Sequence, residues 1–364
     1  MTYKRFTRLI IIYSFAIFLV NVILWNTQTG KIFEQEKISR HGDLARLGYF
    51  NVVPAITKQR EKPSYTHIEF ADYIKNSNYD PKVDILTIGD SFFNGAGGSY
   101  FQDIIVSDYN YRVLNIETMP EYNALEMVDV LLNSGYLDRI SPKVIIVESA
   151  ERECINRYGE KLYFDNPKYQ VSEERLYQYY THKSIIKPNT YSVFDARMYD
   201  ANSKYLISKL NMFINKGNLN DSVGYKTLKT PLFSNSGQET LLLYYADDEK
   251  SGLKVDNQKV RNINDNFNSL SVTLANRKTQ LVFLLAVDKL NLYSNYVENK
   301  AVPVNLLFPY MRELEKNYIF VDTKDILEQE VAKGEKDIYW LDDTHWSWKG
   351  QGTVAKRLVE TFKF

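Results

Sequence analysis

Short apolar segments that alternate with helical patterns constrain the fold of this chain most. Five of them are rich in aliphatic residues and end at turn-forming or charged residues, as buried strands do; they span residues 83–88, 111–116, 143–148, 280–286 and 318–322. Stretches with apolar residues at helical spacing lie between them, at residues 124–132, 264–275 and 306–316. Because consecutive parallel strands need a crossover connection, the alternation predicts an α/β fold of three layers, a parallel sheet with helices on both faces.

Composition excludes several classes of protein. Lys plus Arg and Asp plus Glu each number 45 among 364 residues, so no basic excess exists to bind a nucleic-acid backbone. A single cysteine, Cys154, excludes an internal disulfide, and only four histidines argue against a multi-histidine metal site. Neither a phosphate-binding loop nor a dinucleotide fingerprint is present. We therefore expect no nucleic-acid partner, no metal and no nucleotide cofactor.

The amino terminus predicts a membrane anchor. Residues 9–25 carry no charge over 17 positions, which is the short end of what spans a bilayer. Lys4, Arg5 and Arg8 precede them, so the positive-inside rule predicts a cytoplasmic amino terminus. We expect a single-pass signal anchor in the cell membrane, with the rest of the chain periplasmic or extracellular. A cleaved signal peptide and a buried core helix are the alternatives, but neither a small-x-small cleavage site nor an amphipathic stripe is present.

The remaining sequence divides by its texture. After a cytoplasmic stub and transmembrane anchor at residues 1–26, polar and mixed residues from 27 to 80 predict a stem and a leading element of the next domain. The strand and helix pattern occupies residues 81–364. Within it, residues 155–260 are rich in Tyr, Asn, Lys and Ser and show no clear periodicity. We interpret 155–260 as an insertion carried by the α/β core.

The first candidate for chemistry follows the first predicted strand. Gly89, Asp90 and Ser91 come directly after residues 83–88, where α/β proteins bind their ligands. A nucleophilic serine needs an exposed hydroxyl, a base and donors for the oxyanion. Gly95 lets the backbone approach a ligand closely. An ordinary strand turn with an Asp or Ser helix cap is the alternative interpretation.

The second candidate is a histidine motif that lies just before the last predicted helix. That helix is expected at about residues 350–362. His345 follows Asp342 and Asp343, and an acid at this spacing can hold an imidazole in one tautomer. A solvent-exposed loop histidine is the alternative. Ser91 after the first core strand and an acid–histidine pair before the final helix support each other better than either motif does alone.

These motifs resemble the SGNH (GDSL-type) superfamily and, more narrowly, its alginate O-acetyltransferase branch of AlgJ/AlgX-like proteins. The resemblance rests on Gly89-Asp90-Ser91 and on Asp343-Thr344-His345-Trp346, which looks like the D-x-H-W motif of that branch. Residues 147–152 and 286–296 are similar to two further segments of the branch. The resemblance covers residues 81–364 and implies an SGNH/flavodoxin-like sheet. The glycine of the superfamily's second block and the Gly-x-Asn-Asp of its third block are absent here.

The resemblance implies a role for each matching residue. Ser91 would be the nucleophile that accepts an acyl group, and its backbone N–H would be one oxyanion donor. His345 would be the general base, and Asp343 would orient His345, with Asp342 in reserve because the wider superfamily uses D-x-x-H.

Further residues are candidates for oxyanion or substrate contacts: Gly95, Arg152, Lys289, Tyr293 and Trp346. Arg152 would supply a cationic donor or pair with a neighbouring glutamate. Lys289 and Tyr293 would face the cleft or pack at a helix start, and Trp346 would stack on a sugar or lie in the core. The second oxyanion donor stays unassigned.

The implied function is that of a membrane-anchored O-acetyltransferase. It would transfer acetyl groups to hydroxyls of a cell-surface or secreted polysaccharide through an acyl-serine intermediate. Because acyl-CoA does not occur outside the membrane, the resemblance implies a membrane-bound O-acyltransferase as the partner that hands over the acyl group. Two alternatives stay open: an esterase or polysaccharide deacetylase that uses the same residues, and a non-catalytic glycan-binding assembly component.

Overall fold

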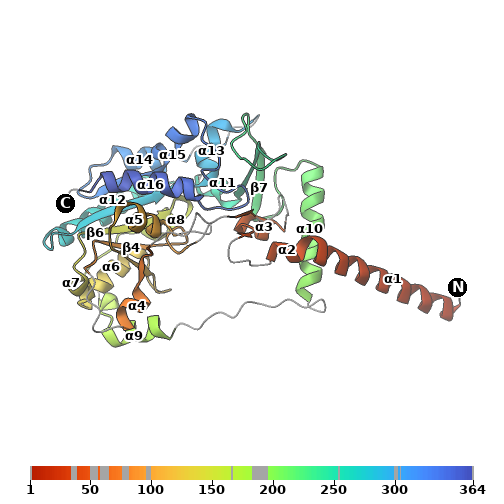
Figure 1. Cartoon of the computed structure of the whole chain (residues 1–364), viewed down its shortest axis with the longest axis horizontal. Helices are drawn as coiled ribbons and strands as arrows, with labels where there is room; N and C mark the ends of the chain where they lie inside the picture. The colour runs from red at the N-terminus through yellow and green to blue at the C-terminus, as the bar shows by residue number, and fades with distance from the viewer. Residues whose placement is uncertain are drawn as a thin grey trace.

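A computed structural model of the chain shows a central sheet flanked by helices and an amino-terminal helix that projects from the body (Figure 1). The described residues are 2–33, 39–49, 56–57, 65–75, 82–95, 100–164, 167–182, 196–252, 255–298, 302–303 and 305–362.

The central sheet has six strands, and all its pairings are parallel. In spatial order the strands are β10 (Ile319–Asp322), β9 (Gln280–Ala286), β6 (Val144–Ala150), β4 (Ile85–Gly89), β5 (Val113–Glu117) and β3 (Ile68–Glu69). The α/β prediction is therefore confirmed, and each of the five predicted strands ends within two residues of its expected bounds. The short edge strand β3 was not predicted, because two residues carry no periodicity.

The aliphatic character of the strands follows from burial on both faces. Every residue of β4 and β6 is buried, and so is all of β9 after Gln280. A strand covered by helices on both sides has no solvent face on which polar residues could alternate with apolar ones. This is why continuous apolar runs located the strands in the sequence.

Helices cover the two faces of the sheet. Three of them pack together on one face: α5 (Phe101–Tyr109), α15 (Thr323–Ala332) and α16 (Trp348–Glu360). The other face carries α6 (Ala124–Asn133), α8 (Glu151–Tyr158), α12 (Asn257–Ala275) and α14 (Leu307–Glu313). The two sets lie on opposite faces because right-handed crossovers that run in opposite directions along a sheet place their helices on opposite sides.

The strand order creates a topological switch beside β4. The chain passes from β4 to β5 on one side and later returns to β6 on the other side of β4. The strands β5-β4-β6-β9-β10 thus have the doubly wound order 2-1-3-4-5. Connections diverge at the carboxyl ends of β4 and β6, and folds of this order bind their ligands outside the carboxyl ends of the strands at such a switch.

Shorter elements lie between the strands and helices of the core. The helices are α3 (Asp43–Gly48), α4 (Phe70–Lys75), α7 (Tyr136–Ile140), α13 (Lys289–Tyr293) and the 3-10 turns η3 (Pro167–Tyr169) and η4 (Ser294–Tyr296). Two antiparallel pairs join β1 (Ser39–Arg40) to β2 (Ile56–Thr57) and β7 (Val223–Thr227) to β8 (Leu241–Tyr245).

The range 155–260 holds more regular structure than its sequence indicates. Besides the β7–β8 hairpin it contains α9 (Glu173–Thr181), α10 (Ala196–Phe213) and α11 (Asp247–Gly252). Its two ends belong to α8 and α12, which pack on each other. A small second core joins the hairpin to Leu44 of α3 through Leu219, Val223, Tyr225 and Leu243.

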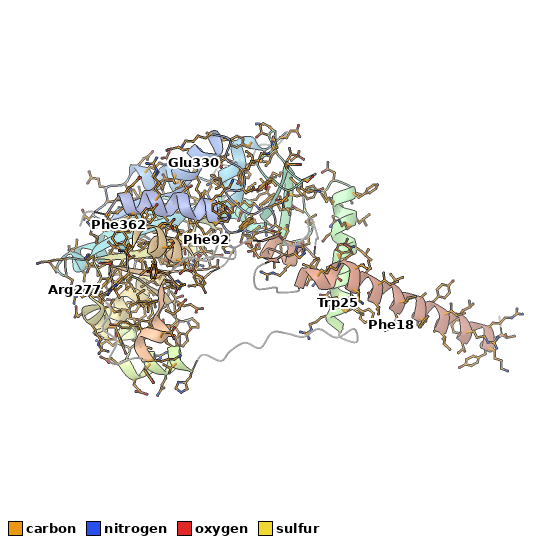
Figure 2. All side chains as sticks on the ribbon, viewed as in Figure 1. Phe18, Trp25, Phe92, Arg277, Glu330 and Phe362 are labelled. Atoms are coloured by element: carbon orange, nitrogen blue, oxygen red, sulfur yellow. The ribbon has the colours of Figure 1, made fainter. Side chains whose placement is uncertain are left out.

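The amino-terminal helix extends beyond the apolar segment. α1 (Tyr3–Leu24) continues into a π-helical turn, η1 (Trp25–Thr29), and then α2 (Gly30–Phe33). Its most apolar window has a mean hydropathy of 2.2 and is 6% buried, so the helix is long and apolar enough to span a membrane and is not a core helix. Figure 2 shows Trp25 where this helix meets the body, with Phe18 farther out.

Candidate active site

Ser91 lies just after the end of β4, beside the topological switch. Ser91 is exposed, whereas the two residues after it, Phe92 and Phe93, are buried in the core. Close packing just before the turn requires glycine: a Cβ on Gly89 would lie 2.5 Å from Oε2 and 2.8 Å from Cβ of Glu148. The tight contact between the ends of β4 and β6 therefore fixes the position from which Ser91 emerges.

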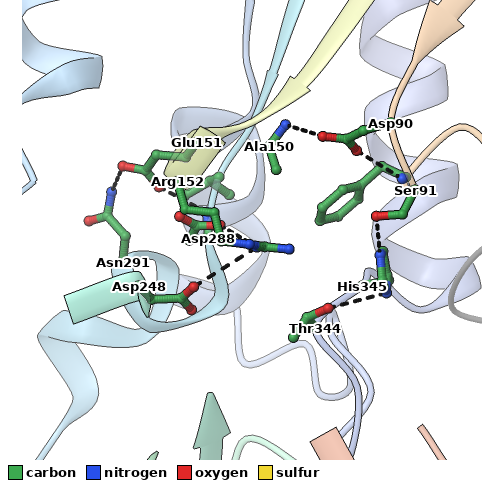
Figure 3. Close-up of polar contacts among 12 residues, drawn as sticks. Asp90, Ser91, Ala150, Glu151, Arg152, Asp248, Asp288, Asn291, Thr344 and His345 are labelled. Atoms are coloured by element: carbon green, nitrogen blue, oxygen red, sulfur yellow. Dashed lines mark hydrogen bonds and ion pairs between the residues drawn. The ribbon is translucent and has the colours of Figure 1, made fainter. Parts of the chain in front are cut away.

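The Ser91 hydroxyl begins a series of contacts through three side chains, and Figure 3 shows the first of them, between Ser91 and His345. Ser91 Oγ lies 2.7 Å from His345 Nε2, and His345 Nδ1 lies 2.8 Å from Asp343 Oδ1. When Nδ1–H donates to Asp343, Nε2 carries the lone pair that can accept the hydroxyl proton of Ser91. His345 and Asp343 are buried. The structure thus brings together the serine, the histidine and the acid that the two motifs singled out.

A buried lysine holds the loop that carries the histidine. Lys289 Nζ donates to the carbonyl oxygens of Trp340, Leu341 and Asp343 at 2.6, 2.7 and 3.1 Å. Three carbonyl oxygens satisfy the three ammonium protons that burial removes from water. Lys289 accordingly fixes the backbone beside Asp343, as a packed residue at the start of α13.

Asp342 makes a different contact from Asp343. Its Oδ2 accepts the Gly42 N–H at 2.8 Å and lies 3.7 Å from His41 Nδ1. Asp342 therefore joins the segment before α3 to the histidine loop. Of the two acids considered for orienting His345, the structure places Asp343 at the imidazole.

A second carboxylate at His345 comes from α3 and was not anticipated. Asp43 Oδ2 lies 3.5 Å from His345 Nδ1. The Asp43 carboxylate also accepts the backbone N–H of Thr344 at 2.7 Å and its hydroxyl at 2.5 Å. Asp43 belongs to the polar range interpreted as a stem, and no local pattern marks a contact between the two ends of the chain. An acid at the start of a short helix was the one local signal, and ordinary helix starts share it.

The acids around His345 set its basicity. Burial lowers the pKa of His345, but the hydrogen bond to Asp343 and the charges of Asp343 and Asp43 outweigh burial, so the pKa is raised above its ordinary value. Burial and the neighbouring Asp343 raise the pKa of Asp43. A histidine with a raised pKa is a stronger base for the proton of Ser91, provided that the pH leaves the imidazole neutral.

Asp90 fixes the turn that presents Ser91. Its Oδ2 accepts the Ala150 N–H at 3.0 Å and Arg157 Nη1 at 2.5 Å. Burial alone would raise the pKa of Asp90, but the charge of Arg157 and the Ala150 hydrogen bond hold it below its ordinary value. Glu148 Oε2 accepts the Asp90 N–H at 2.8 Å. Burial and the Asp90 charge raise the pKa of Glu148 well above its ordinary value.

Arg152 pairs with buried acids beside the Ser91–His345 pair. Its Nη1 donates to Asp288 Oδ1 at 2.7 Å and lies 3.9 Å from Asp248 Oδ1. Figure 3 shows the guanidinium group between these acids and the Ser91–His345 pair. Burial raises the pKa of Asp288 to about 6 against the opposing effect of Arg152. The cation is also near enough to lower the pKa of His345.

The other sequence candidates have structural positions. Gly95 has a φ of +74°, which favours glycine in the turn after Ser91. Tyr293 is buried, and its hydroxyl accepts the Tyr339 N–H at 3.3 Å. Trp346 is buried with its ring centroid 4.8 Å from that of Phe92. For Tyr293 and Trp346 the structure therefore agrees with the packing interpretation, and it presents neither ring to a ligand.

The acids at His345 also have the spacing of a metal site. Asp43, Asp343 and His345 each offer one ligand atom, and these atoms lie within 4.8 Å of one another. The imidazole nitrogen available to such an ion is Nδ1, the atom that faces Asp343 at 2.8 Å. A metal on Nδ1 and a hydrogen bond from Nδ1–H to Asp343 exclude each other, so the two uses of this cluster can be separated by experiment.

Comparisons with protein-family models, with curated proteins and with solved structures found no match to this chain.

Proposed function

We propose that this chain is a serine acyltransferase of the SGNH type, anchored in the cell membrane, which transfers acetyl groups to hydroxyls of a polysaccharide outside the cytoplasm. The observation that carries the proposal is the continuous chain of contacts from Ser91 Oγ to His345 at 2.7 Å and from His345 to Asp343 at 2.8 Å. The chain of contacts starts at an exposed hydroxyl beside the topological switch and ends at a buried acid, which is the arrangement that activates a serine.

The first half of the reaction loads the serine. Ser91 Oγ attacks the carbonyl carbon of the acyl donor while His345 Nε2 takes the hydroxyl proton. The tetrahedral intermediate then collapses, the bond to the leaving group breaks, and Nε2 returns the proton to the leaving group. Asp343 keeps the imidazole in the required tautomer and stabilises the imidazolium that forms during each proton transfer.

The backbone amides around Ser91 support an oxyanion donor in the proposed reaction. In the turn of residues 90–94, the Asp90 N–H donates to Glu148 and the Phe92 N–H donates to the Asp90 carboxylate. The next two amides donate to the Asp90 carbonyl oxygen. Among the described residues 90–94, the Ser91 N–H is thus the amide left for the oxyanion, as the resemblance implied. The oxyanion is the former carbonyl oxygen of the acyl group bonded to Ser91 Oγ, so it would form close to this donor.

The second half of the reaction transfers the acyl group. A hydroxyl of the acceptor sugar attacks the acyl-serine carbonyl carbon and gives its proton to His345 Nε2. The Ser91–acyl bond breaks, and Nε2 returns the proton to Ser91 Oγ. The exposure of Ser91 supports a large acceptor, because a polysaccharide can reach a hydroxyl that lies at the surface.

The membrane anchor supports the choice of acyl donor. With α1 in the bilayer and Lys4, Arg5 and Arg8 in the cytoplasm, the Ser91 site lies on the far side of the membrane from acyl-CoA. The acyl group then has to be handed over by a membrane-bound O-acyltransferase partner. Small acetyl esters can replace this donor in an assay.

The test uses the full chain in detergent with a chromogenic acetyl ester, with and without an acceptor oligosaccharide. Mass spectrometry measures acetyl on Ser91 and on the sugar, in the parent chain, Ser91→Ala and His345→Ala. Ser107→Ala on α5 and His182→Ala after α9 are the matched controls. We expect acetylated sugar in the parent and both controls and none in the two site variants.

Other outcomes identify the other functions. Acetate release that depends on Ser91 but never yields acetylated sugar would establish an esterase or polysaccharide deacetylase instead. Ester turnover that survives in Ser91→Ala, or glycan acetylation in cells that does not need Ser91, would contradict the catalytic role and leave the glycan-binding assembly component.

A further inference from the structure

We infer that α10 is a second membrane contact, which lies in the lipid headgroup region with its apolar face toward the acyl chains. The relation of α10 to the bilayer rests on α1 crossing the membrane as proposed above, and it does not depend on catalysis.

The first argument is an apolar stripe that the protein leaves uncovered. Five large apolar side chains of α10 and the turn after it are between 46% and 85% exposed: Leu206, Ile207, Leu210, Phe213 and Ile214. At 100° per residue they fall within an arc of about 120°, the width of one face of an amphipathic helix. Scattered exposed apolar residues are ordinary, but a continuous stripe of this size marks a surface that contacts lipid or protein.

The stripe is not the face that packs on the protein. That face is made by other residues, which are buried: Met198, Ala201, Asn202, Tyr205 and Ser208. A third face is polar and includes Asp200 paired with Lys204 at 2.7 Å. The helix therefore has three faces. One packs on the body, one is polar and faces water, and the third is apolar and is not covered by any part of the chain that the structure describes.

The second argument is the depth at which α10 meets the membrane helix. Asn202 Nδ2 donates to Asn21 O at 2.9 Å and to Asn21 Oδ1 at 3.0 Å, and Thr29 Oγ1 donates to Asn202 Oδ1 at 2.5 Å. Asn21 precedes Trp25 by four residues, so with α1 across the bilayer it lies about 6 Å deeper in the membrane than Trp25. The contact with Asn21 therefore places α10 near the depth of the membrane interface. Trp residues gather at the membrane interface, and interfacial helices bury their apolar face about 5–10 Å into the headgroup boundary.

The third argument is orientation and charge. Figure 1 shows α10 crossing the inner end of α1 rather than running along it, as a helix in the plane of the membrane would. Residues 196–216 contain Arg197, Lys204, Lys209 and Lys216 against one acid, Asp200. A basic, amphipathic helix at the exit of a membrane span fits a position in the lipid headgroup region.

Two contacts connect this helix to the candidate active site. Ser208 Oγ of α10 donates to the Gly48 carbonyl oxygen of α3 at 2.6 Å. At the other end of α3, Asp43 holds the His345 loop through Thr344. With α1 across the bilayer and α10 on its surface, the site is held at one height and one tilt above the membrane. This suits a donor that is presented at the membrane surface.

The experiment measures the depth of single positions in lipid. The full chain carries Cys154→Ser, which removes the one buried cysteine, and one new cysteine, Leu210→Cys on the stripe or Asp200→Cys on the polar face. Each is labelled with an environment-sensitive fluorophore and inserted into vesicles of neutral and anionic phospholipid. Quenching is measured with iodide in the water and with phospholipids that carry a quencher near the headgroup.

We expect the label at position 210 to be quenched several-fold more by the lipid-borne quencher, and several-fold less by iodide, than the label at position 200. Equal iodide quenching at both positions would overturn the membrane contact. Shielding of position 210 from both quenchers would also overturn it, because protein rather than lipid would then cover the stripe. None of these readings requires Ser91 to react, so failure of the acyltransferase proposal leaves them unchanged.

Discussion

Asp43 Oδ2 lies 3.5 Å from His345 Nδ1, although the two residues are about three hundred positions apart in the sequence. Asp343 occupies the same nitrogen at 2.8 Å. The imidazole therefore lies against two carboxylates, one from its own loop and one from α3. Asp343 has the shorter contact and holds the tautomer, while Asp43 holds Thr344 and adds negative charge.

The charge of Asp43 should affect how acetyl-ester turnover depends on pH. Because Asp43 raises the pKa of His345, Asp43→Asn should lower that pKa. The neutral base would then persist to lower pH, and the acidic limb of the kcat/KM profile for acetyl-ester turnover should move to lower pH. Asp265→Asn on the exposed side of α12 is the control. A limb that stays in place in Asp43→Asn, with the rate at its plateau unchanged, would show that Asp43 has no electrostatic effect on the base.

Substitutions of Asp343 and Asp342 should have very different effects on the rate of Ser91 acylation. Asp343→Asn removes the charge that stabilises the imidazolium and favours the wrong tautomer, so the rate of Ser91 acylation should fall about 10²- to 10⁴-fold. Asp342→Asn keeps an oxygen for the Gly42 N–H, so its rate should stay within a few-fold of the parent. Stopped-flow acylation measures both. Comparable losses in the two variants would contradict the distinction.

Gly89→Ala should destabilise the fold. Its Cβ would lie 2.5 Å from Glu148 Oε2, and both strands that would have to separate are buried. We expect a loss of about 1–3 kcal/mol in the free energy of unfolding. Gly352→Ala in α16 is the matched control: nothing lies within 4 Å of its Cβ, and alanine in a helix should add up to about 1 kcal/mol. Chemical unfolding of both variants gives the comparison, and equal stability would refute the packing argument.

His67 should contribute stability that depends on pH. Its Nδ1 lies 2.7 Å from Asp103 and its Nε2 lies 2.8 Å from Glu69. Burial lowers the pKa of His67, but these hydrogen bonds outweigh burial and raise the pKa to about 9. The folded-state pKa exceeds the unfolded one, so the stabilisation is complete below about pH 6.5 and is lost as pH rises through 9.

We therefore expect His67→Gln to cost roughly 2 kcal/mol near pH 7, and the difference from the parent should shrink as the pH rises from about 6.5 to 9. Unfolding curves across this pH range measure it, with His182→Gln as the exposed control. A stability difference that is constant from pH 6 to 10 would show that His67 contributes by packing alone.

Removal of metal should leave the reaction intact. The proposed mechanism uses Nδ1 of His345 for the hydrogen bond to Asp343, which leaves that nitrogen unable to ligate. After treatment with a chelator, the acylation rate of Ser91 should equal that of the untreated chain. A loss that zinc restores would establish that Asp43, Asp343 and His345 bind a metal.

The sequence predicted those parts of the fold whose causes are local. β4, β6 and β9 are covered on both faces, so their buried runs were visible as continuous apolar segments. The pairing of Ser91 with His345 followed from their places after the first core strand and before the last helix. The packing roles of Lys289 and Trp346 stayed open, because a lysine that donates to three carbonyl oxygens has no pattern in the sequence.

The sequence did not predict features that depend on contacts between residues far apart in the chain. Asp43 stands in a polar segment, and what makes it part of the site is the fold that places α3 against the His345 loop. The apolar stripe of α10 was obscured by the Tyr, Asn, Lys and Ser around it, because two of its three faces carry polar or buried residues. Both features depend on neighbours that are distant in sequence, and local periodicity does not report them.

The second core, in which Leu44 packs with residues of the β7–β8 hairpin, has a practical consequence for anyone who prepares this protein without its anchor. A chain that begins at residue 81 would keep five strands of the main sheet, but it would lose the edge strand β3 together with Gly42, Asp43 and Leu44. That would remove the Gly42 N–H that donates to Asp342, uncover the side of His345 that faces Asp43, and expose the apolar side of the hairpin. A form without the anchor that is meant to keep these contacts must therefore begin before residue 39, because α3 and β3 lie ahead of residue 81.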